Sequence, residues 1–427
     1  MNTTWPTVAN VELVKKLTGA ILAAADPTPS VARFAYTLPS DGAPISLLAV
    51  GKAAVPMATS ALDTLGDRVV RSLVFTTEHL GAKSLSARCE VLVGDHPLAT
   101  PRNVEGSRRV VEYLRDPSGK DHLLLILLSG GGSALITLPA QGLALEDITR
   151  LSSALMRRGC AIDELNCVRK HCELSKGGRL AALSSAMRIK VCLVSDVIGD
   201  PLSVIASGPF APDPTTFDDA MNVLLKFDAV GESESITQYL RTCMEGAHKE
   251  TPKPGDPLFD RVTHDVVLSN TNAVEAAVDA LSELGYSPAT LRAHTGEAKD
   301  AAKQITLTLG EHDAVVMGGE PIVSGIEDGS VGGPMQEAVL AAALELERDL
   351  FDWLVFGLAT DGRDGPTDAA GAAIDRRMLQ RARENGVALE TSLNSHNTHP
   401  VLADMGALIR TGPTGTNIND VLIAIRR

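Results

Sequence analysis

Two glycine-containing turns in this sequence have the residue types that bind phosphate. Residues 123–133 read LLLILLSGGGS, an apolar run that stops at a serine and three glycines. Glycines let the backbone turn tightly and bring bare N–H groups against an anion, because no Cβ atom stands in the way. The same glycines would also suit a simple turn from a strand into a helix, so both interpretations stay open at this point.

The second turn, VGKAA at 50–54, adds a cation. Lys52 follows a strand-end glycine, and a lysine there points into the space above the sheet edge, where it would pair with a phosphate. The alternative is a solvated lysine in an ordinary turn.

Phosphoryl transfer needs a phosphate cradle, cations, carboxylates for a metal ion and a group that orients the attacking hydroxyl. Polar turns after other apolar runs supply these classes, although each turn alone would also suit helix capping. Magnesium needs only one or two of the acids. VGG at 331–333 is a second candidate cradle; the cations are Lys52, Arg169, Lys170, Lys176 and Arg179, and the carboxylates are Asp196, Asp200, Glu320, Asp361, Asp364 and Asp368.

The histidines carry less information. His171, His396 and His399 lie in polar segments without a strong metal-binding spacing. His96, in the segment GDHPL, is interpreted as a structural or rim residue.

The elements that must position these turns follow an alternation of strands and helices. Apolar runs at 45–50 and 123–128 predict strands buried on both faces of a parallel sheet. Thr100 and Pro101 predict a helix start, and an opening helix is expected over 11–25. In doubly wound α/β sheets, ligands bind beyond the carboxyl ends of the strands. The fold class is therefore α/β, with the polar turns at the strand ends.

Length and composition favour two domains without a nucleic-acid surface. A chain of 427 residues suits two domains of roughly 200 residues each. The segment TPKPGDP at 251–257 is the clearest linker, which places the domains at 1–250 and 258–427. The net charge of −14 argues against a nucleic-acid or anionic-membrane partner.

Cysteine usage indicates a reducing compartment. The six cysteines show no CxxC spacing and are scattered through patterned segments. No apolar stretch reaches ~18 residues, and the N-terminus lacks the pattern of a secretory signal. The expected location is the cytoplasm.

Common nucleotide fingerprints are absent, but longer motifs are present. There is no GxxxxGK[ST] loop and no GxGxxG after the first strand. The chain instead resembles the glycerate 2-kinase family, whose members have two domains, the second of MOFRL type. The motifs that carry the resemblance are VGKAA (50–54), GDHPLATPRNV (94–104), LSGGGSAL (128–135), NCVRKH and SKGGRLA (within 166–181), VSDVIGDPLSVIASGPFAPDPTTF (194–217), ATDGRDGPTDAAGA (359–372) and TGPTGTNINDV (411–421).

The resemblance implies a Rossmann-like doubly wound N-terminal domain, a smaller α/β C-terminal domain and an interdomain cleft. It implies ATP- and Mg²⁺-dependent phosphorylation of D-glycerate at its 2-hydroxyl, with small-molecule substrates and no nucleic-acid or membrane partner. Assembly into a homo-oligomer is left open. The family's catalytic lysine falls on Lys52.

The expected site combines this resemblance with charge and strand-end position. Lys52 stabilises charge on the transferring phosphoryl group, Asp196 orients the hydroxyl or the metal ion, and Arg169 or Lys176 pairs with the glycerate carboxylate. The remaining expected residues are Ser129, Gly130, Gly131, Gly132, Ser133, Asn270, Gly332 and Gly333 for nucleotide and phosphate, Glu320 and Asp361 for the metal, and Arg363 for catalysis.

One position departs from the family pattern. Family members read GGRNQE where this chain reads GGPMQE, so Pro334 replaces an arginine implicated in catalysis. Arg363 or another basic residue would then supply the charge, or activity is reduced. Proline at a first-turn position leaves the helix intact. Two alternatives remain: a hydroxypyruvate reductase-type oxidoreductase, and a catalytically impaired binding protein on the kinase fold.

Overall fold

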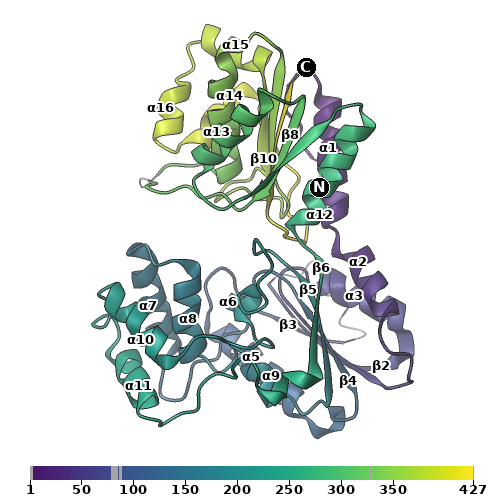
Figure 1. Ribbon diagram of the computed structural model, residues 1–427, viewed down its shortest axis with the longest axis vertical. Helices are drawn as coiled ribbons and strands as arrows, with labels where there is room; N and C mark the ends of the chain where they lie inside the picture. The colour runs from purple at the N-terminus through teal and green to yellow at the C-terminus, as the bar shows by residue number, and fades with distance from the viewer. Residues whose placement is uncertain (1–2, 78–84, 86–88, 327–328, 427) are drawn as a thin grey trace. The chain divides into compact units, whose positions relative to one another are not determined.

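The computed structural model describes residues 3–77, 85, 89–326 and 329–426. Contacts within the chain define two compact units (Figure 1). Unit 1 comprises Met1–Asp26, Asp196–Ile198 and Leu268–Arg427, and unit 2 comprises Pro27–Ser195 and Gly199–Val267.

Unit 2 is built on a six-stranded sheet of order β3-β2-β1-β4-β5-β6. Its strands from β3 to β5 are parallel. Every residue of β1 and β4 is buried, as their unbroken apolar sequence predicts. The strands are β1 (Ile45–Val50), β2 (Val69–Thr76), β3 (Glu90–Val93), β4 (Leu123–Leu128), β5 (Arg188–Val194) and β6 (Val262–Leu268).

Helices α3 (Ala54–Leu65) and α5 (Pro101–Arg115) pack against this sheet. Helix α5 begins as predicted, because the Thr100 side chain accepts a hydrogen bond from the Arg102 backbone N–H and Pro101 occupies the first turn. The shorter elements beside the sheet are α2 (Pro27–Tyr36), α6 (Gly132–Leu135), α9 (Arg179–Leu183), η1 (Gly66–Arg68), η2 (Pro117–Gly119), η3 (Ile205–Ser207) and η4 (Pro257–Arg261).

Four further helices of unit 2 enclose a separate apolar core (Figure 1). They are α7 (Leu145–Arg157), α8 (Ile162–Cys172), α10 (Phe217–Lys226) and α11 (Glu234–Met244). Helix α7 contributes the buried side chains of Ile148, Leu151 and Leu155 to this core. All six cysteines are free thiols, as their spacing predicts.

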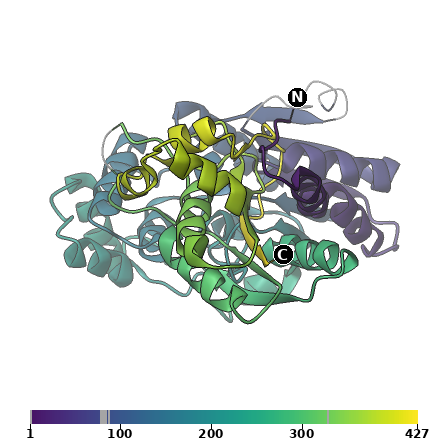
Figure 2. The same cartoon turned by 90° about the horizontal axis from the view of Figure 1, so that it is seen from above.

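Unit 1 contains a mixed six-stranded sheet of order β11-β10-β9-β12-β8-β7. The last strand of the chain, β12 (Asp420–Arg426), lies antiparallel between β8 (Ala314–Gly319) and β9 (Trp353–Ala359). Seen from above, this yellow end of the chain lies among green segments of the same unit (Figure 2). The other strands are β7 (Pro288–His294), β10 (Gly371–Asp375) and β11 (Leu408–Ile409).

Helices flank this second sheet, and the first helix of the chain is one of them. Helix α1 (Val11–Ala25) packs against α12 (Asn270–Glu283), and Figure 1 shows the two side by side. Its bounds match the predicted opening helix. The remaining helices are α13 (Ala298–Leu309), α14 (Pro334–Glu345), η5 (Leu346–Arg348), α15 (Arg376–Glu384), α16 (Leu389–Asn394) and α17 (Thr398–Met405).

The boundaries of the two units differ from the expected domains 1–250 and 258–427. Residues up to Asp26 belong with the C-terminal segment, because the apolar face of α1 packs on α12. The segment 251–257, which we expected to be a linker, is part of unit 2: Thr251 is buried and its hydroxyl donates to the Asp213 carboxylate at 2.9 Å. The chain passes into unit 1 only after Val267. Among the described residues, no helix combines the length and apolarity that crossing a bilayer requires.

Candidate functional site

The strand order of unit 2 reverses between β1 and β4, and the two glycine-containing turns follow these two strands. Adjacent parallel strands with connections in opposite directions create a crevice beyond their carboxyl ends, where α/β proteins bind ligands. The pairing of β1 with β4 continues into the turns: Ser129 N–H donates to Val50 O at 3.0 Å, and Lys52 N–H donates to Gly130 O at 2.8 Å. The structure thus brings Lys52 together with the segment Ser129–Ser133.

Two glycines are required by this close approach. Gly51 has φ +129°, and a Cβ atom there would lie 2.2 Å from Ser129 Oγ. Gly131 has φ +83°, and its Cβ would lie 3.0 Å from Lys52 Cγ. Side chains at either position would separate the two turns. The absence of a side chain at Gly51 and Gly131 allows the two turns to approach each other. It also lets the Lys52 side chain lie against the Gly131 backbone.

His96 also lies in this region, although the sequence suggested only a structural or rim residue. A Cβ at Gly131 would lie 3.3 Å from His96 Cδ2. Burial, followed by the positive charge of Lys52, lowers the pKa of His96 to about 4. The imidazole is therefore neutral at physiological pH and offers a hydrogen-bond acceptor beside Lys52.

Asn103 joins the loop that carries His96 to the turn after β4. Its Oδ1 accepts from the Asp95 and Thr100 backbone N–H groups at 3.1 Å, and its Nδ2 donates to Asp95 O and Ala134 O at 2.9 Å. The side chain is fully buried. Asn103 therefore fixes the relative positions of three segments around the site.

Replacing Asn103 by alanine is expected to lower the free energy of unfolding by about 2 kcal/mol, because buried polar groups lose their partners. Thermal unfolding followed by circular dichroism measures this loss. Arg102→Ala, at the neighbouring exposed position of α5, serves as the control. Equal melting temperatures for the two variants would contradict the bracing role of Asn103.

Lys176 and Arg169 hold the turn after β4 through hydrogen bonds to its backbone carbonyls. Lys176 is fully buried, and its ammonium donates to Ser133 O at 2.6 Å and Ile136 O at 2.7 Å. Arg169 Nη2 donates to Ser133 O at 2.9 Å. The buried Glu173 carboxylate lies 3.4 Å from both cations. Burial lowers the pKa of Lys176 to about 7, and Glu173 opposes that shift.

This arrangement separates the two residues that we expected to bind the glycerate carboxylate. The Lys176 ammonium is enclosed by protein carbonyls and Glu173, so its position favours holding the turn over contacting a substrate. The Arg169 side chain keeps 18% of its surface exposed. Ser133 is itself held through its hydroxyl, which lies 2.6 Å from Ser207 Oγ.

A cluster of carboxylates lies at one edge of the sheet in unit 1. Glu320 follows β8, Asp361 comes shortly after β9, and Asp420 begins β12 in register with Gly319 and Ala359. Burial, followed by the charges of Asp364, Asp361 and Glu320, raises the pKa of Asp420 well above its usual range. Sequence analysis missed Asp420; its position at the start of the apolar run VLIAI was the available signal.

Asp364 caps the helix that Pro334 begins. Its carboxylate accepts from Met335 N–H at 2.9 Å and Gln336 N–H at 2.8 Å. Burial raises the pKa of Asp364 to about 6, although these hydrogen bonds oppose the shift. Pro334 occupies the first turn of α14, which confirms that the helix tolerates proline there.

The glycines before this helix are tightly packed. A Cβ at Gly333 would lie 2.3 Å from Asp364 Cγ, and one at Gly332 would lie 2.4 Å from Thr398 Oγ1. Arg363 is exposed, and its Nε donates to Thr367 O at 3.3 Å.

Two other expected site residues, Asn270 and Asp196, take part in side-chain-to-backbone hydrogen bonds within unit 1. Asn270 Nδ2 donates to Ile418 O at 2.9 Å and Asp420 O at 3.0 Å, so this amide holds the start of β12. The Asp196 carbonyl accepts a hydrogen bond from Asn419 Nδ2 at 2.8 Å. Within the described parts of the chain, no group of three or more His, Cys, Asp or Glu side chains has the arrangement of a metal site.

Comparisons with known proteins cover both units. Residues 13–241 match the family described as "Domain of unknown function (DUF4147)", and residues 313–420 match the MOFRL family. A protein named glycerate 2-kinase from Pyrococcus horikoshii is 36% identical over 89% of this chain and 87% of its own length. The chain belongs to the glycerate 2-kinase family.

Other members of the glycerate 2-kinase family agree in sequence and fold. A D-glycerate 2-kinase from Thermotoga maritima is 34% identical over 89% of this chain and 90% of its own. The crystal structure of a glycerate kinase from Thermotoga maritima superposes with a TM-score of 0.84, at 31% identity, over 97% of this chain and 99% of that chain. The family and the two-domain α/β fold expected from the motifs are thereby confirmed.

Proposed function

We propose that this protein is an ATP-dependent glycerate 2-kinase, which transfers the γ-phosphoryl group of ATP to the 2-hydroxyl of D-glycerate. The products are 2-phosphoglycerate and ADP. The observation that carries the proposal is the pairing of Lys52 with the Ser129–Ser133 turn at the reversal of strand order, in a chain whose relatives bear this name.

In the proposed reaction, the 2-hydroxyl oxygen forms a bond to the γ-phosphorus while the bond to the β,γ-bridging oxygen breaks. Negative charge spreads over the transferring group and the leaving ADP oxygen. Lys52 stabilises this charge, and the backbone N–H groups of the Ser129–Ser133 turn bind phosphate oxygens. His96 is neutral and stands beside Lys52, so it adds no competing positive charge at neutral pH.

The other roles follow from charge and position. Arg169 pairs with the glycerate carboxylate, because its side chain remains partly exposed. Asp196 orients the 2-hydroxyl and receives its proton. For the remaining residues we propose that Arg363 supplies positive charge, and that Asn270, Gly332 and Gly333 lie along the nucleotide.

The carboxylates of unit 1 have the donor chemistry that Mg²⁺ prefers. Glu320 and Asp361 would hold the ion, with Asp420 between the ends of β8 and β9 as a further oxygen donor. Burial and, after it, the charges of Asp364, Asp361 and Glu320 raise the pKa of Asp420, and a bound cation would offset both effects. Bound Mg²⁺ would neutralise charge on the phosphate oxygens.

Chelation of divalent cations is expected to abolish turnover, and added Mg²⁺ to restore it. Asp361→Asn is expected to raise the Mg²⁺ concentration for half-maximal rate about tenfold, because one charged oxygen donor is lost. Mg²⁺ titration of the initial rate measures the effect. The exposed Asp352→Asn is the matched control, and an unchanged Mg²⁺ requirement in Asp361→Asn would exclude this carboxylate from the metal site.

A single assay tests the proposed function. The protein is incubated with ATP, Mg²⁺ and D-glycerate, ADP release is followed by coupled oxidation of NADH, and ³¹P NMR identifies the product. We expect 2-phosphoglycerate; formation of 3-phosphoglycerate, or no ADP, would contradict the proposal. L-glycerate serves as the stereochemical control.

Two further measurements, of ligand binding and of hydroxypyruvate reduction, separate the alternatives. A binding protein, motivated by Pro334, would bind ATP or glycerate without turnover, and Pro334→Arg would then be expected to restore activity. A reductase would oxidise NAD(P)H with hydroxypyruvate. The first turn after β1 reads VGKAA and lacks the glycine pattern that binds a dinucleotide, which disfavours this second alternative.

We also propose a reducing, cytoplasmic location, supported by the six free thiols.

A further inference from the structure

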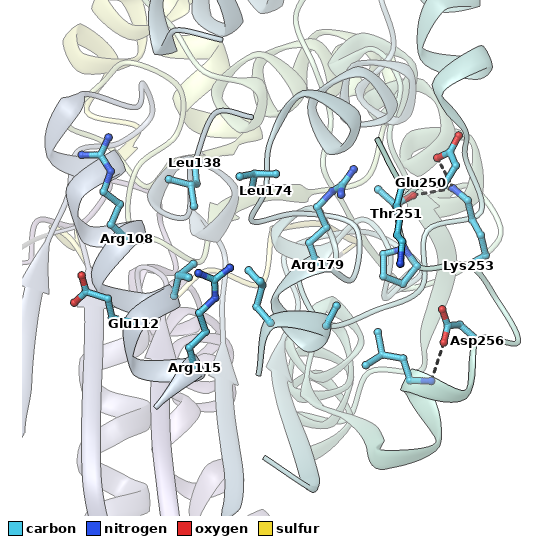
Figure 3. Close-up of a pocket in the computed structure, with 16 residues that line it drawn as sticks. Arg108, Glu112, Arg115, Leu138, Leu174, Arg179, Glu250, Thr251, Lys253 and Asp256 are labelled. Atoms are coloured by element: carbon cyan, nitrogen blue, oxygen red, sulfur yellow. Dashed lines mark hydrogen bonds and ion pairs between the residues drawn. The ribbon is translucent and has the colours of Figure 1, made fainter. Parts of the chain in front are cut away.

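A large cavity lies in unit 2, and it contains none of the residues assigned to the chemistry. Its volume is about 970 Å³. Helix α5 contributes Arg108, Glu112 and Arg115 on one side, and residues 249–258 form the other side (Figure 3). Leu138, Leu174 and Arg179 lie between these two walls (Figure 3). The cavity is therefore a second concave surface, built from separate elements of the same unit.

Cationic side chains outnumber carboxylates around this cavity, although the chain as a whole carries a charge of −14. The acids have partners: Glu250 bonds with Lys253 and the Phe217 N–H, Asp256 accepts from the Leu258 N–H, and Glu112 lies 3.6 Å from Arg109. Two of the cations are also paired, Lys253 with Glu250 and Arg108 with Glu105 outside the cavity, which leaves Arg115, Arg179 and Lys249. A local excess of cations in an acidic protein favours an anionic ligand. The cations are Arg108, Arg115, Arg179, Lys249 and Lys253.

Two of the arginines lack a side-chain partner among the described residues. Within the described residues, neither Arg115 nor Arg179 makes a side-chain hydrogen bond or ion pair, and Arg179 Nε is buried without a partner. Burial lowers the pKa of Arg179, and the nearby Tyr239, Glu250 and Asp213 side chains oppose this shift. A buried donor without a partner is uncommon and indicates an unfilled interaction. A carboxylate or phosphate oxygen would satisfy it.

Apolar side chains line the rest of the cavity. They are Val111, Leu138, Leu174, Leu183 and Leu258. An inorganic anion would leave this surface exposed, whereas an anion with an apolar body would cover it.

We propose that this cavity binds an organic anion, in which a carboxylate or phosphate group pairs with Arg179 and Arg115 and an apolar body contacts the leucines. This is a binding site distinct from the turn that carries Lys52, and the proposal does not depend on the kinase reaction.

The walls of the cavity are continuous with the network that holds the phosphate turn. Leu174 N–H donates to Leu138 O at 2.7 Å, and Arg179 N–H donates to Lys176 O at 3.2 Å. Lys176 in turn binds the carbonyls of Ser133 and Ile136. A ligand that moves Arg179 or Leu174 therefore acts on residues directly bonded to this network. This coupling, unlike the site itself, rests on the proposed binding of ATP at the phosphate turn: occupancy of the cavity is expected to change the dissociation constant of ATP, and ATP that of the cavity ligand by the same factor.

Isothermal titration calorimetry of the full chain with octyl phosphate tests the site. Saturating ADP and D-glycerate are present, so that the probe does not compete at the phosphate turn. Octanoate distinguishes a carboxylate ligand from a phosphate ligand. The proposal requires tight binding of octanoate or of octyl phosphate, and the tighter of the two is called the better amphiphile. Inorganic phosphate and hexanol test whether charge and apolar body are both needed, and each is expected to bind at least about tenfold more weakly than the better amphiphile.

Arg115→Glu is the first variant, because this exposed arginine can be changed without disturbing the core. Its dissociation constant for the better amphiphile is expected to rise at least about tenfold, since one charge-assisted hydrogen bond is lost. Arg157→Glu, an exposed arginine of α7 outside the cavity, makes the same charge change and is expected to leave the constant within about twofold. Arg179→Met tests the buried donor directly.

Three results would overturn the proposal. They are equal binding in Arg115→Glu and Arg157→Glu, inorganic phosphate binding as tightly as octyl phosphate, or loss of probe binding in Lys52→Ala. The last result would place the probe at the phosphate turn. Because binding is measured without turnover, a failure of the kinase assay leaves this test unaffected, and the two proposals fail separately.

Discussion

Lys52→Ala is expected to lower kcat/KM for D-glycerate phosphorylation about 10²- to 10³-fold, the loss typical of removing one preorganised donor from a developing negative charge. The Lys52 backbone is bonded to Gly130 O, and its side chain packs over Gly131. The Lys52 side chain therefore lies against the turn proposed to bind phosphate. Initial rates under subsaturating substrate, with ADP release coupled to NADH oxidation, measure the effect.

The folded state should be unaffected by this change. The backbone contacts of residue 52 remain in alanine, so the melting temperature is expected to stay within about 2 °C of the parent. Lys120→Ala, at an exposed position after η2, is the matched control and should retain full activity. If Lys52→Ala keeps kcat/KM within about tenfold of the parent, Lys52 does not stabilise the transition state.

Lys176→Met is expected to lower the free energy of unfolding of unit 2 by about 3 kcal/mol, because it leaves the buried Glu173 carboxylate with Arg169 as its remaining cationic neighbour. Methionine keeps most of the side-chain volume, so the loss reports on charge and hydrogen bonds. A fall in melting temperature of about 6–10 °C corresponds to this loss. Activity should fall as well, since Ser133 O and Ile136 O lose a donor.

A double-mutant cycle with Glu173→Gln isolates the pair. Glu173→Gln removes the buried carboxylate charge and should therefore recover part of the stability that Lys176→Met loses. The losses in free energy of unfolding from the two substitutions are then not additive. Additive losses would show that Lys176 and Glu173 do not interact.

The pH dependence of stability provides an independent check on Lys176. Burial lowers its pKa from 10.5 to about 7 in the folded chain. Between these values the unfolded chain binds more protons, so this lysine makes the free energy of unfolding rise with pH from about 7 to about 10. Lys176→Met should lack this contribution. Parallel profiles for the parent and the variant would contradict the lowered pKa.

Strong local patterns in the sequence predicted much of the fold. The unbroken apolar runs of β1 and β4 and the Thr100–Pro101 start of α5 were found because strand burial and helix capping depend on adjacent residues. Strand β10 was missed, since its sequence GAAID is short and rich in small residues that pack well only against β9. The linker at 251–257 was misplaced because buried Thr251 pairs with Asp213, which is remote in sequence.

In the candidate site, too, residues next to a strand end were predicted and residues placed by long-range packing were not. Lys52 and the Ser129–Ser133 turn were predicted because each directly follows its own strand. His96 was missed because only the packing around Gly131 brings it beside Lys52. Lys176 was expected to face a substrate, but burial is a property of the folded chain, and a charged residue in a basic segment gives no sign of it. The assignment of catalytic and metal-binding roles stays a prediction.

The central position of β12 makes the order of synthesis important for unit 1. This strand is synthesised after β8 and β9, yet it pairs with both of them. Before β12 is made, the described strands β8 and β9 have no common neighbour, and α1 is made long before α12, against which it packs. Unit 2 is fully synthesised by residue 267 and can fold while the rest of the chain is translated. A nascent chain stalled before residue 420 would therefore present a formed unit 2 and two apolar strands, β8 and β9, each with one exposed edge, and such edges favour chaperone binding.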